Sequence, residues 1–592
     1  MCTGRVRSPD PDAIETISQM IVEDSRRLTG PNLYLDGAGA IMDVHGEGIV
    51  FDSALEFWAQ HILVLLKAVG WTGSVTSVRR FSYGASLAFS GPIDALYAGT
   101  EINEAAWEAA VGTATAGIPP DPLTKLSELK KLIAEERNPA LLALERATME
   151  HDLTFLWDDD YASIGLGNGS KTWAVDKLPA PDGVDWALHH DIPVALITGT
   201  NGKSTTARLL GSILRAAGKT PGLTSTDYIA VGDEILDRGD YSGPGGARTA
   251  MRDQRVDAGV LEVARGGILR RGLGVPTASA AAVTNVAADH LGDYGIESVA
   301  DLAQAKFVVA KALREGGVLV TNADNTFCRK EVNRLAESLK KRGATVCWTS
   351  PNPENPLIAE AGQTDGRACS VIDGELAYSE NDSWKPVVSA AELPVTFGGR
   401  ATYNIRNCLT ALGLAKALGI EDEAIEKGLR SFESDPETNP GRGNLFDVQG
   451  AQILIDFAHN EHALSAIAES ITRIPAKRRL VLMGQAGDRT DDEVRGLTRA
   501  AAMLNADRYV LVDMPNYLRG KETGEVPAFI NSVLLNEGIP DSSIVFEADP
   551  INGTRHALDW AQPGDFLLLL SLTQREECIA LIRERIASET DG

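Results

Sequence analysis

The chain has 592 residues, too many for a single hydrophobic core, so its length predicts roughly three or four domains. Its hydrophobic fraction of 44% is typical of a folded protein, and its formal charge of −26 at pH 7 argues against a nucleic-acid partner. No apolar run approaches the length that we expect of a membrane span, and the six scattered cysteines include no C-x-x-C pair. Because the first residues also lack the apolar core of a signal peptide, we expect a cytoplasmic protein without a membrane partner.

Residues 1–180 are predicted to form a separate N-terminal domain of the α+β class, with substrate binding as its candidate role. Apolar residues recur at helical spacing over 51–69, and we expect Trp58 and His61 on the buried face of that helix. His61 is interpreted as a packed histidine, because no second ligand lies at metal spacing. Two further helices are predicted over 121–150, and the acidic run 158–160 is interpreted as a solvated loop rather than a metal cluster.

The most informative stretch is a glycine-rich turn between a buried strand at 194–197 and a helix from Ser204 onward. Backbone amides in such a turn point at a helix N-terminus, where they favour phosphate oxygens. We expect Lys203 to reach the terminal phosphates and Ser204 to offer its hydroxyl to Mg²⁺. Ile197 occupies the place of the first glycine of the full P-loop pattern, so the match to that pattern is incomplete. An ordinary tight turn is the alternative, but it explains the sequence less well than a phosphate-binding turn does, because Gly-Lys-Ser follows a buried strand. The predicted phosphate-binding residues are Gly199, Thr200, Asn201, Gly202, Lys203, Ser204 and Thr205.

Residues 181–434 alternate strand and helix patterns, which predicts a parallel P-loop sheet with helices on both faces. One strand ends near Glu262, and another ends near Asn285, shortly before His290. Ligands of open α/β sheets bind at the carboxyl ends of strands, so Ser204, Glu262 and His290 could share one Mg²⁺ site. Taken singly, Glu262 and His290 would more often be structural residues.

Three arginines follow Glu262 in the string ARGGILRR, where they could meet an acceptor carboxylate or form surface ion pairs; both alternatives stay open for Arg265, Arg270 and Arg271. Residues 351–393 are interpreted as a long excursion with short strands. Residues 435–592 resume the strand–helix alternation, which predicts a second, smaller α/β domain of the Rossmann-like kind.

The strings GTNGKSTT and TNVAADHLG, with Glu262 between them, resemble the ATP-binding middle domain of the Mur ligase family. The resemblance implies a three-domain α/β architecture with ATP and Mg²⁺ as cofactors. GRATYNIRN resembles the adenine-contacting segment, while GRGNLF and IDFAHN resemble the opening of the C-terminal domain. These matches imply that Asn404 and Asn407 lie near the nucleotide, Arg442 near its phosphates, and Asp456, His459 and Asn460 near its ribose and the closed interface.

Lys306 aligns, by its distance from His290, with a lysine that many family members carbamylate to gain a further metal ligand. An ordinary surface lysine is the alternative. Within the family, TSTDYIAVGDEILDRGDYSGPGGARTA and LEVARGGILRRGLG resemble the ligase half of the cyanophycin synthetases, and the likeness extends over roughly 192–583. The residues after Glu150 leave no room for the ATP-grasp domain of those enzymes, which implies a separate ATP-grasp partner.

The resemblance implies an ATP-dependent, ADP-forming ligase that joins an amino acid to a peptide or aspartate-like carboxylate through an acyl phosphate. Lys203, Glu262, His290 and Arg442 are its predicted catalytic residues. The alternatives are a cell-wall-precursor or folylpolyglutamate-type ligase, and a catalytically silent nucleotide-binding partner of an ATP-grasp enzyme. The sequence also leaves open a homo-oligomer.

Overall fold

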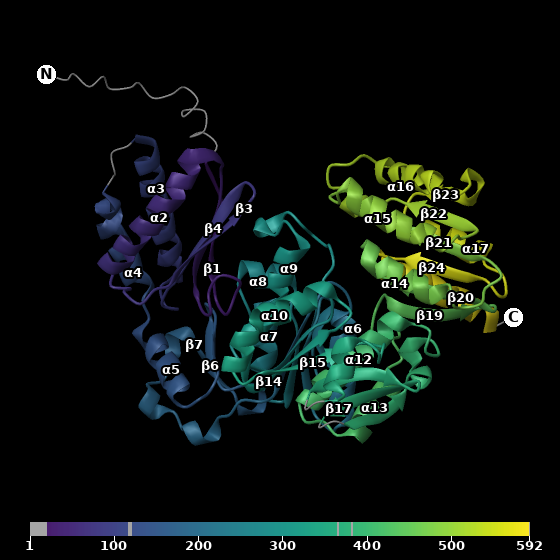
Figure 1. The fold of residues 1–592 in the computed structure, drawn as a ribbon, viewed down its shortest axis with the longest axis horizontal. Coiled ribbons are helices and arrows are strands. Elements are labelled where there is room, and N and C mark those ends of the chain that lie inside the picture. The colour runs from purple at the N-terminus through teal and green to yellow at the C-terminus, as the bar shows by residue number, and fades with distance from the viewer. Residues whose placement is uncertain (1–19, 117–120, 364–365, 381–382, 591–592) are drawn as a thin grey trace. The chain divides into compact units, whose positions relative to one another are not determined.

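The computed structural model describes residues 20–116, 121–363, 366–380 and 383–590 (Figure 1). Cys2 and most of the N-terminal segment considered for a signal peptide lie outside these residues. The chain divides into two compact units. The first comprises residues 1–199, 218–321 and 325–346, and the second comprises residues 200–217, 322–324 and 347–592.

The first unit begins with an antiparallel sheet of order β1-β2-β4-β3. Alternate side chains of its central strands pack under two long helices and share one core with them, which confirms the predicted α+β character. The elements are β1 (Ile21–Leu28), β2 (Gly39–His45), α2 (Gly48–Ala68), β3 (Thr76–Phe81), β4 (Gly84–Ser90) and α3 (Leu96–Ala116).

Helix α2 is 21 residues long, with a mean hydropathy of 1.5 in its most apolar window, and by length and composition alone it could cross a membrane. The expectation that no run approaches that length is therefore wrong. Trp58, Ile62 and Leu65 are fully buried in the core with α3 and the sheet, as in the core helix of a folded domain. His61 is packed as predicted: its Nε2 lies 3.0 Å from Thr113 Oγ1, and burial lowers its pKa.

Two helices and a small antiparallel sheet of order β5-β6-β7 follow. The predicted helix break is confirmed at Asn138, whose side chain accepts a hydrogen bond from Leu141 N and caps the second helix. The acidic run is more than a solvated loop, because Asp158 pairs with Arg252 and Asp159 pairs with Arg27. The elements are α4 (Leu126–Glu136), α5 (Pro139–Glu150), β5 (Phe155–Trp157), β6 (Tyr161–Ile164) and β7 (Lys171–Ala174).

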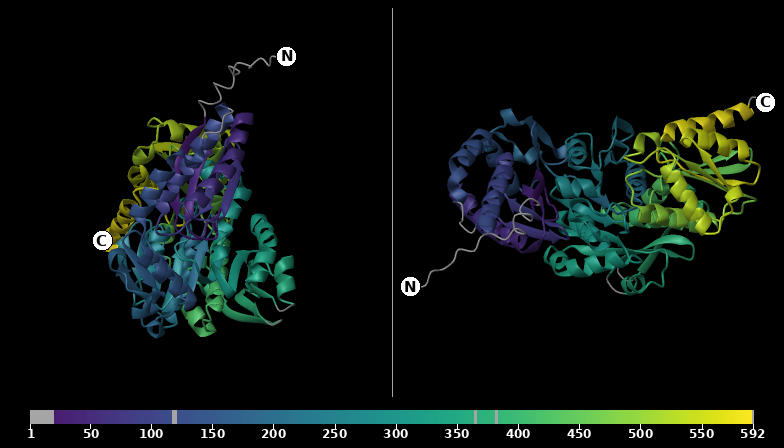
Figure 2. Two further views of the ribbon diagram at one scale, coloured as in Figure 1. Left: turned by 90° about the vertical axis from the view of Figure 1, so that its left-hand side faces the viewer. Right: turned by 90° about the horizontal axis from the view of Figure 1, so that it is seen from above.

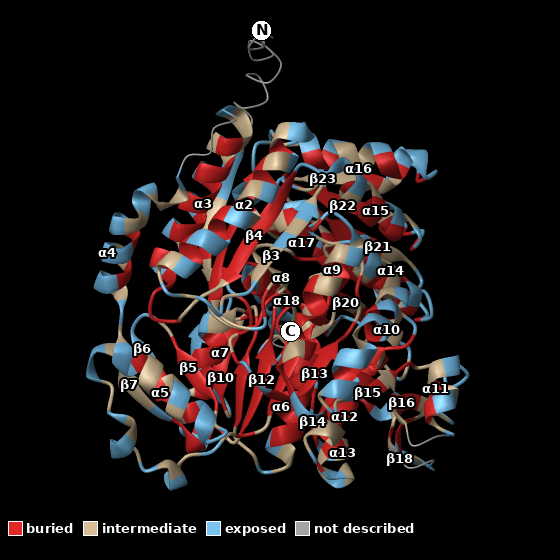
Figure 3. Cartoon of the chain, turned by 60° about the vertical axis from the view of Figure 1, so that its left-hand side comes forward, coloured by how far each residue is buried: buried red, intermediate tan, exposed pale blue. Residues whose placement is uncertain are grey.

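The main sheet of the first unit has the order β11-β10-β9-β12-β8-β13-β14, and its parallel core consists of β9, β12, β8, β13 and β14. Both β12 and β13 are buried along their whole length, as expected of parallel strands covered on both faces (Figure 3). The strands are β8 (Val194–Thr198), β9 (Pro221–Thr224), β10 (Tyr228–Val231), β11 (Glu234–Arg238), β12 (Ala258–Glu262), β13 (Ala278–Val283) and β14 (Leu313–Asn322). The helices are α7 (Pro244–Met251), α8 (Arg265–Arg270), α9 (Val299–Lys306) and α10 (Thr326–Lys341).

The second unit contains α6 (Lys203–Ala216), which begins where the glycine-rich turn ends, as predicted. The excursion at 351–393 adds strands to a ladder of order β15-β16-β17-β18, although it also contains a short helix that the sequence did not suggest. The elements are β15 (Thr345–Thr349), α11 (Pro356–Ala361), β16 (Arg367–Ile372), β17 (Glu375–Glu380), β18 (Ser383–Ser389), α12 (Thr402–Ala417) and α13 (Asp422–Arg430).

The chain closes with a six-stranded sheet of order β19-β20-β24-β21-β22-β23, parallel except for β19, which confirms the predicted Rossmann-like domain. Its helices pack on both faces: α14, α15 and α16 share one core, and α17 and α18 share the other (Figures 1 and 2). The predicted domain boundaries near residues 180 and 434 remain predictions. The elements are β19 (Arg442–Val448), β20 (Ala451–Asp456), α14 (Glu461–Ile471), β21 (Arg479–Met483), α15 (Asp491–Ala502), β22 (Arg508–Val512), α16 (Glu525–Asn536), β23 (Ile544–Glu547), α17 (Pro550–Trp560), β24 (Phe566–Leu570) and α18 (Arg575–Thr590).

Candidate active site

The carboxyl ends of three neighbouring parallel strands, β12, β8 and β13, meet at one edge of the main sheet. The register places Glu262 beside Ile197, and Val283 beside Thr198. The chain leaves β8 at Gly199, so the acidic end of β12 and the start of the glycine-rich turn lie at the same edge. This edge is where open α/β sheets bind ligands.

Gly199 begins the turn in a position that excludes any side chain. Its φ is +149°, and a Cβ atom would lie 1.9 Å from Thr284 Oγ1. Its main-chain oxygen accepts a hydrogen bond from Lys306 Nζ at 2.8 Å. Lys306 is only 3% exposed, so the alternative of an ordinary surface lysine is wrong. Its carbamylation stays a prediction.

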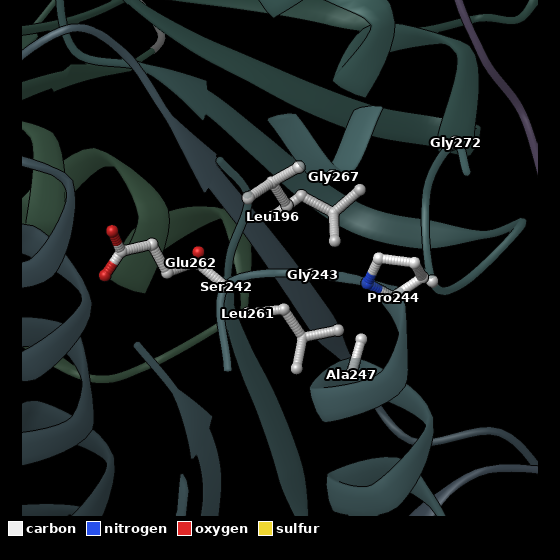
Figure 4. A pocket seen from close by; sticks show the side chains of 11 residues that line it. Leu196, Ser242, Gly243, Pro244, Ala247, Leu261, Glu262, Gly267 and Gly272 are labelled. Carbon is white, nitrogen blue, oxygen red and sulfur yellow. The ribbon is translucent and has the colours of Figure 1, made fainter. Parts of the chain in front are cut away.

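Glu262 is 2% exposed, and neither of its carboxylate oxygens has a hydrogen-bond partner among the described residues. A buried carboxylate without a partner is costly, and a metal ion at this edge would remove that cost. The residue also borders a small apolar cavity of about 10 Å³, room for a single water molecule, but Figure 4 shows its carboxylate pointing away from the other side chains of that cavity. The donor chemistry of Glu262 therefore fits Mg²⁺, and the cavity is too small to bind a substrate.

His290 lies in the loop after β13, exposed and at a φ of +49°. Arg265 holds this loop, because its Nη1 donates to His290 O and its Nη2 lies 2.7 Å from Asp293 Oδ2. The surface ion-pair alternative thus applies to Arg265. Arg270 donates instead to Gly266 O within its own helix. The metal-binding role of His290 stays a prediction.

In the second unit, Gly202 caps the start of α6 with a φ of +85°, and a Cβ atom there would lie 2.2 Å from Asn407 Oδ1. Lys203 Nζ donates to Thr200 O at 3.0 Å, so its ammonium folds back over the turn. The first turn of the helix buries Ser204 and Thr205. Main-chain amides at such a helix start favour anions, which fits a nucleotide phosphate.

Asn407 lies on α12, and a chain of hydrogen bonds fixes its amide. Its Nδ2 donates to Asn404 Oδ1 at 3.0 Å, and Asn404 Nδ2 donates to Val395 O at 2.8 Å. The segment that resembles the adenine-contacting region therefore places Asn407 directly against Gly202. Whether either asparagine contacts a nucleotide stays a prediction.

Asn201 connects the turn to the start of α14. Its amide and that of Asn460 exchange two hydrogen bonds, each of 3.1 Å, and its Nδ2 also lies 3.1 Å from His462 Nδ1. Asn460 caps α14 at the same time, because its Oδ1 accepts from Ala463 N. An amide nitrogen only donates, so His462 Nδ1 accepts, and burial keeps the pKa of this ring low.

Asp456 ends β20 directly opposite Arg442 of β19. Burial raises the pKa of Asp456 to about 6, although the Arg442 charge acts in the opposite direction. The Arg442 guanidinium lies 5.4 Å from the centre of the Phe457 ring, and His459 Nδ1 lies 3.1 Å from Phe457 O. The second unit thus places Arg442, Asp456, His459 and Asn460 within one short stretch of two strands and a helix start.

A buried asparagine network at the start of β19 was not predicted from the sequence. Asn439 is fully buried: it accepts from Arg208 Nη1 at 2.6 Å and donates to Ser434 Oγ and Arg442 O at 2.8 and 3.1 Å. Asn444 donates to Ser434 O and Asn439 O. These bonds fasten the segment that leads into β19 onto α6. The string NPGRGN, with an asparagine on each side of two glycines, was the available signal.

Comparison with known families decides the assignment. Residues 197–415 match the Mur ligase middle domain, and residues 441–571 match the domain described as Mur ligase, glutamate ligase domain. Together the two matches cover more than half of the chain. The chain belongs to the Mur ligase family.

Several curated Mur ligase relatives are cyanophycin synthetases. The enzyme of Trichormus variabilis is 34% identical over 398 residues, which cover 67% of this chain and 42% of that enzyme. The enzyme of Synechocystis sp. is 36% identical over 394 residues, which cover 67% and 44%. This chain therefore spans less than half of the length of these relatives.

A solved structure of E. coli FolC in complex with DHPP and ADP is similar at a TM-score of 0.48 and 20% identity, covering 67% of this chain and 89% of that chain. The family assignment rests on the sequence matches. By this membership the chain is a ligase of the Mur type.

Proposed function

We propose that this Mur ligase is an ATP-dependent, ADP-forming amide ligase that joins an amino acid to a carboxylate of a peptide or aspartate-like acceptor. The observation that carries the proposal is the buried, unpartnered carboxylate of Glu262 at the end of β12, beside the strand that leads into the glycine-rich turn. The described cysteines are all free and buried, which supports a reducing, cytoplasmic setting.

The chemistry needs an activated acyl group, because oxide is a very poor leaving group from a carboxylate. The acceptor carboxylate oxygen attacks the γ-phosphorus of ATP, the bond to ADP breaks, and an acyl phosphate forms. The amino nitrogen then attacks the acyl carbon, phosphate leaves, and the nitrogen loses a proton. The protein positions these groups and neutralises charge as it moves between oxygens.

Each site residue has a proposed share of this work. The main chain of residues 199–205 binds phosphates, while Lys203 and Arg442 offset the charge on the transferred phosphoryl group. Mg²⁺, when bound, would supply positive charge that offsets the negative charge of the phosphates. Its proposed ligands are Ser204, Glu262, His290 and a modified Lys306, and the proposed nucleotide contacts are Asn404, Asn407, Asp456, His459 and Asn460.

A partner is part of the proposal. The cyanophycin synthetases that this chain resembles are more than twice as long as the stretch it matches. We propose that the chain performs one of two successive additions to a peptide, and that a separate ATP-grasp enzyme performs the other.

The decisive experiment is an ADP-release screen of the purified chain against amino acids paired with short aspartate-containing acceptors. Lys203→Ala is the control, and mass spectrometry identifies the product. Release that depends on one pair and disappears in the control supports the proposal. ATP turnover indifferent to every amine and acceptor contradicts it and favours a silent partner of an ATP-grasp enzyme, whereas dependence on a nucleotide sugar or a pterin favours the cell-wall or folate type.

A further inference from the structure

Four arginines of the first unit lie near one another. Arg248 and Arg271 donate hydrogen bonds to the chain at Thr29 and Arg27, and the charge of Arg252 acts on Arg248. Arg248 Nη2 donates to Thr29 Oγ1 at 2.7 Å and to Thr29 O at 3.2 Å. Thr29 N in turn donates to Arg271 O, and Arg271 Nη1 donates to Arg27 O at 3.1 Å. The residues at and just after the end of β1 thus connect the middle of α7 to the residue that follows α8.

The charges in this cluster do not balance. Arg27 makes a two-pronged pair with Asp159, at 2.7 and 2.9 Å, and Arg252 pairs with Asp158. Among the described residues, no carboxylate forms an ion pair with Arg248 or Arg271. Asp158 and Asp159 also act on Arg248 at longer range, and Asp24 acts on Arg271, but each of these carboxylates is already paired with another arginine. Counted by direct ion pairs, four guanidiniums face two carboxylates, a local surplus of positive charge within a chain whose formal charge is −26.

Burial makes that surplus costly. Arg248 is 7% exposed, and its guanidinium lies 5.9 Å from the centre of the Trp157 ring. Burial lowers its pKa to about 10; the Asp158 charge opposes this shift and the Arg252 charge adds to it. Arg271 is exposed, and its pKa is lowered by partial burial and by the Arg27 charge. A bound anion would offset the cost of burying positive charge at both arginines, and it could reach them from solvent because Arg271 is exposed.

The cluster lies close to the proposed reaction centre along the chain. Glu262 ends β12, α8 begins at Arg265, and Arg271 follows the last residue of that helix. A helix of this length spans about 9 Å, and an extended peptide rises about 3.3 Å per residue. A peptide of about three or four residues could therefore contact the arginines while its end approaches the edge of the sheet.

We propose that Arg248 and Arg271, supported by Arg27, form a binding site for the carboxylates of an acidic acceptor peptide. That the bound peptide is the acceptor of the reaction rests on the proposed ligase function, whereas the binding of an acidic peptide at these arginines does not. A planar guanidinium fork matches a carboxylate in geometry as well as charge, which is why this residue type suits the task. The site would select acceptors by their negative charge.

The test measures binding of a fluorescent oligo-aspartate peptide by anisotropy, with an oligo-asparagine peptide of equal length for comparison. Wild-type protein should bind the acidic peptide at least about tenfold more tightly, and the Arg271→Ala variant should lose most of that preference. Arg248→Gln should do the same if thermal unfolding shows that it folds. Arg555→Ala removes an exposed arginine from α17 and is the matched charge control.

Equal binding of the two peptides by wild type, or an unchanged preference in Arg271→Ala, would overturn the site. An equal loss in Arg555→Ala would also overturn it, because the effect would then be one of net charge. The ligase proposal can be contradicted independently of the binding site. If no amine supports ADP release while the acidic peptide still binds through Arg271, the peptide-binding site is supported and the proposed reaction is contradicted.

Discussion

Lys306 Nζ donates a hydrogen bond to the main-chain oxygen of Gly199 at 2.8 Å, and so places a buried amine at the first residue of the glycine-rich turn. Lys306 is the last residue of α9, which follows β13 in the chain, whereas Gly199 directly follows β8. The turn is thus held by a distant part of the chain as well as by its own glycines.

We expect Lys306→Met to reduce the free energy of unfolding by about 1–3 kcal/mol, because a buried carbonyl loses its donor. ADP release should fall as well, since the turn loses its anchor and the site loses a proposed metal ligand. Urea unfolding and the ADP-release assay measure the two effects. Lys340→Met, an exposed lysine of α10, is the control. A variant with wild-type stability and turnover would show that the bond is unimportant.

Glu262→Gln should separate stability from activity. The substitution keeps the shape of the side chain and removes an unpaired buried charge, so the free energy of unfolding should stay level or rise. Mg²⁺-dependent turnover should fall about a hundredfold or more. Glu315→Gln changes an exposed carboxylate of the same unit and should leave turnover unchanged. Unchanged turnover in Glu262→Gln would remove this residue from the metal site.

Gly202→Ala should abolish nucleotide binding, because a methyl group meets two obstacles at this position. The backbone has a φ of +85°, and the new Cβ would lie 2.2 Å from Asn407 Oδ1. Gly218→Ala, just after the other end of α6, has a similar φ of +73° with nothing within 4 Å. That control should lose about 1–2 kcal/mol of stability and still bind ATP by calorimetry. Similar behaviour of the two variants would contradict the packing of Asn407 against the turn.

Asp456 should make stability depend on pH. Its pKa in the folded chain is about 6, above the ordinary value of 3.8, because burial disfavours the charged form. Between these values the folded chain binds more protons than the unfolded chain, so the free energy of unfolding should fall by about 2 kcal/mol as pH rises from about 4 to about 6. Asp456→Asn should lack this fall.

The measurement is the difference in unfolding free energy between wild type and Asp456→Asn at several pH values from 4 to 7. Ile455→Val changes a buried neighbour without adding or removing a titrating group, so its difference from wild type should be independent of pH. A flat difference for Asp456→Asn would show that the carboxyl titrates as it does in the unfolded chain.

Local patterns were enough to predict several parts of the site. The β-branched run before Gly199 and the Gly-Lys-Ser string predicted β8, the turn and α6, and the apolar run ending at Glu262 predicted β12. The buried, packed state of His61 also followed from helical spacing. Each of these depends on neighbours a few residues away, which the sequence displays directly.

The tertiary structure alone decided which distant groups meet. The bond from Lys306 to Gly199, the two bonds between Asn201 and Asn460, and the pairing of Arg27 with Asp159 all join residues far apart in the chain. Strand register and helix docking set these distances, and no short-range periodicity encodes them. The sequence by itself determined β8, β12, α6 and the glycine-rich turn between β8 and α6, because their signals are local. Long-range packing decided which polar groups are buried and which charges lack an ion-pair partner.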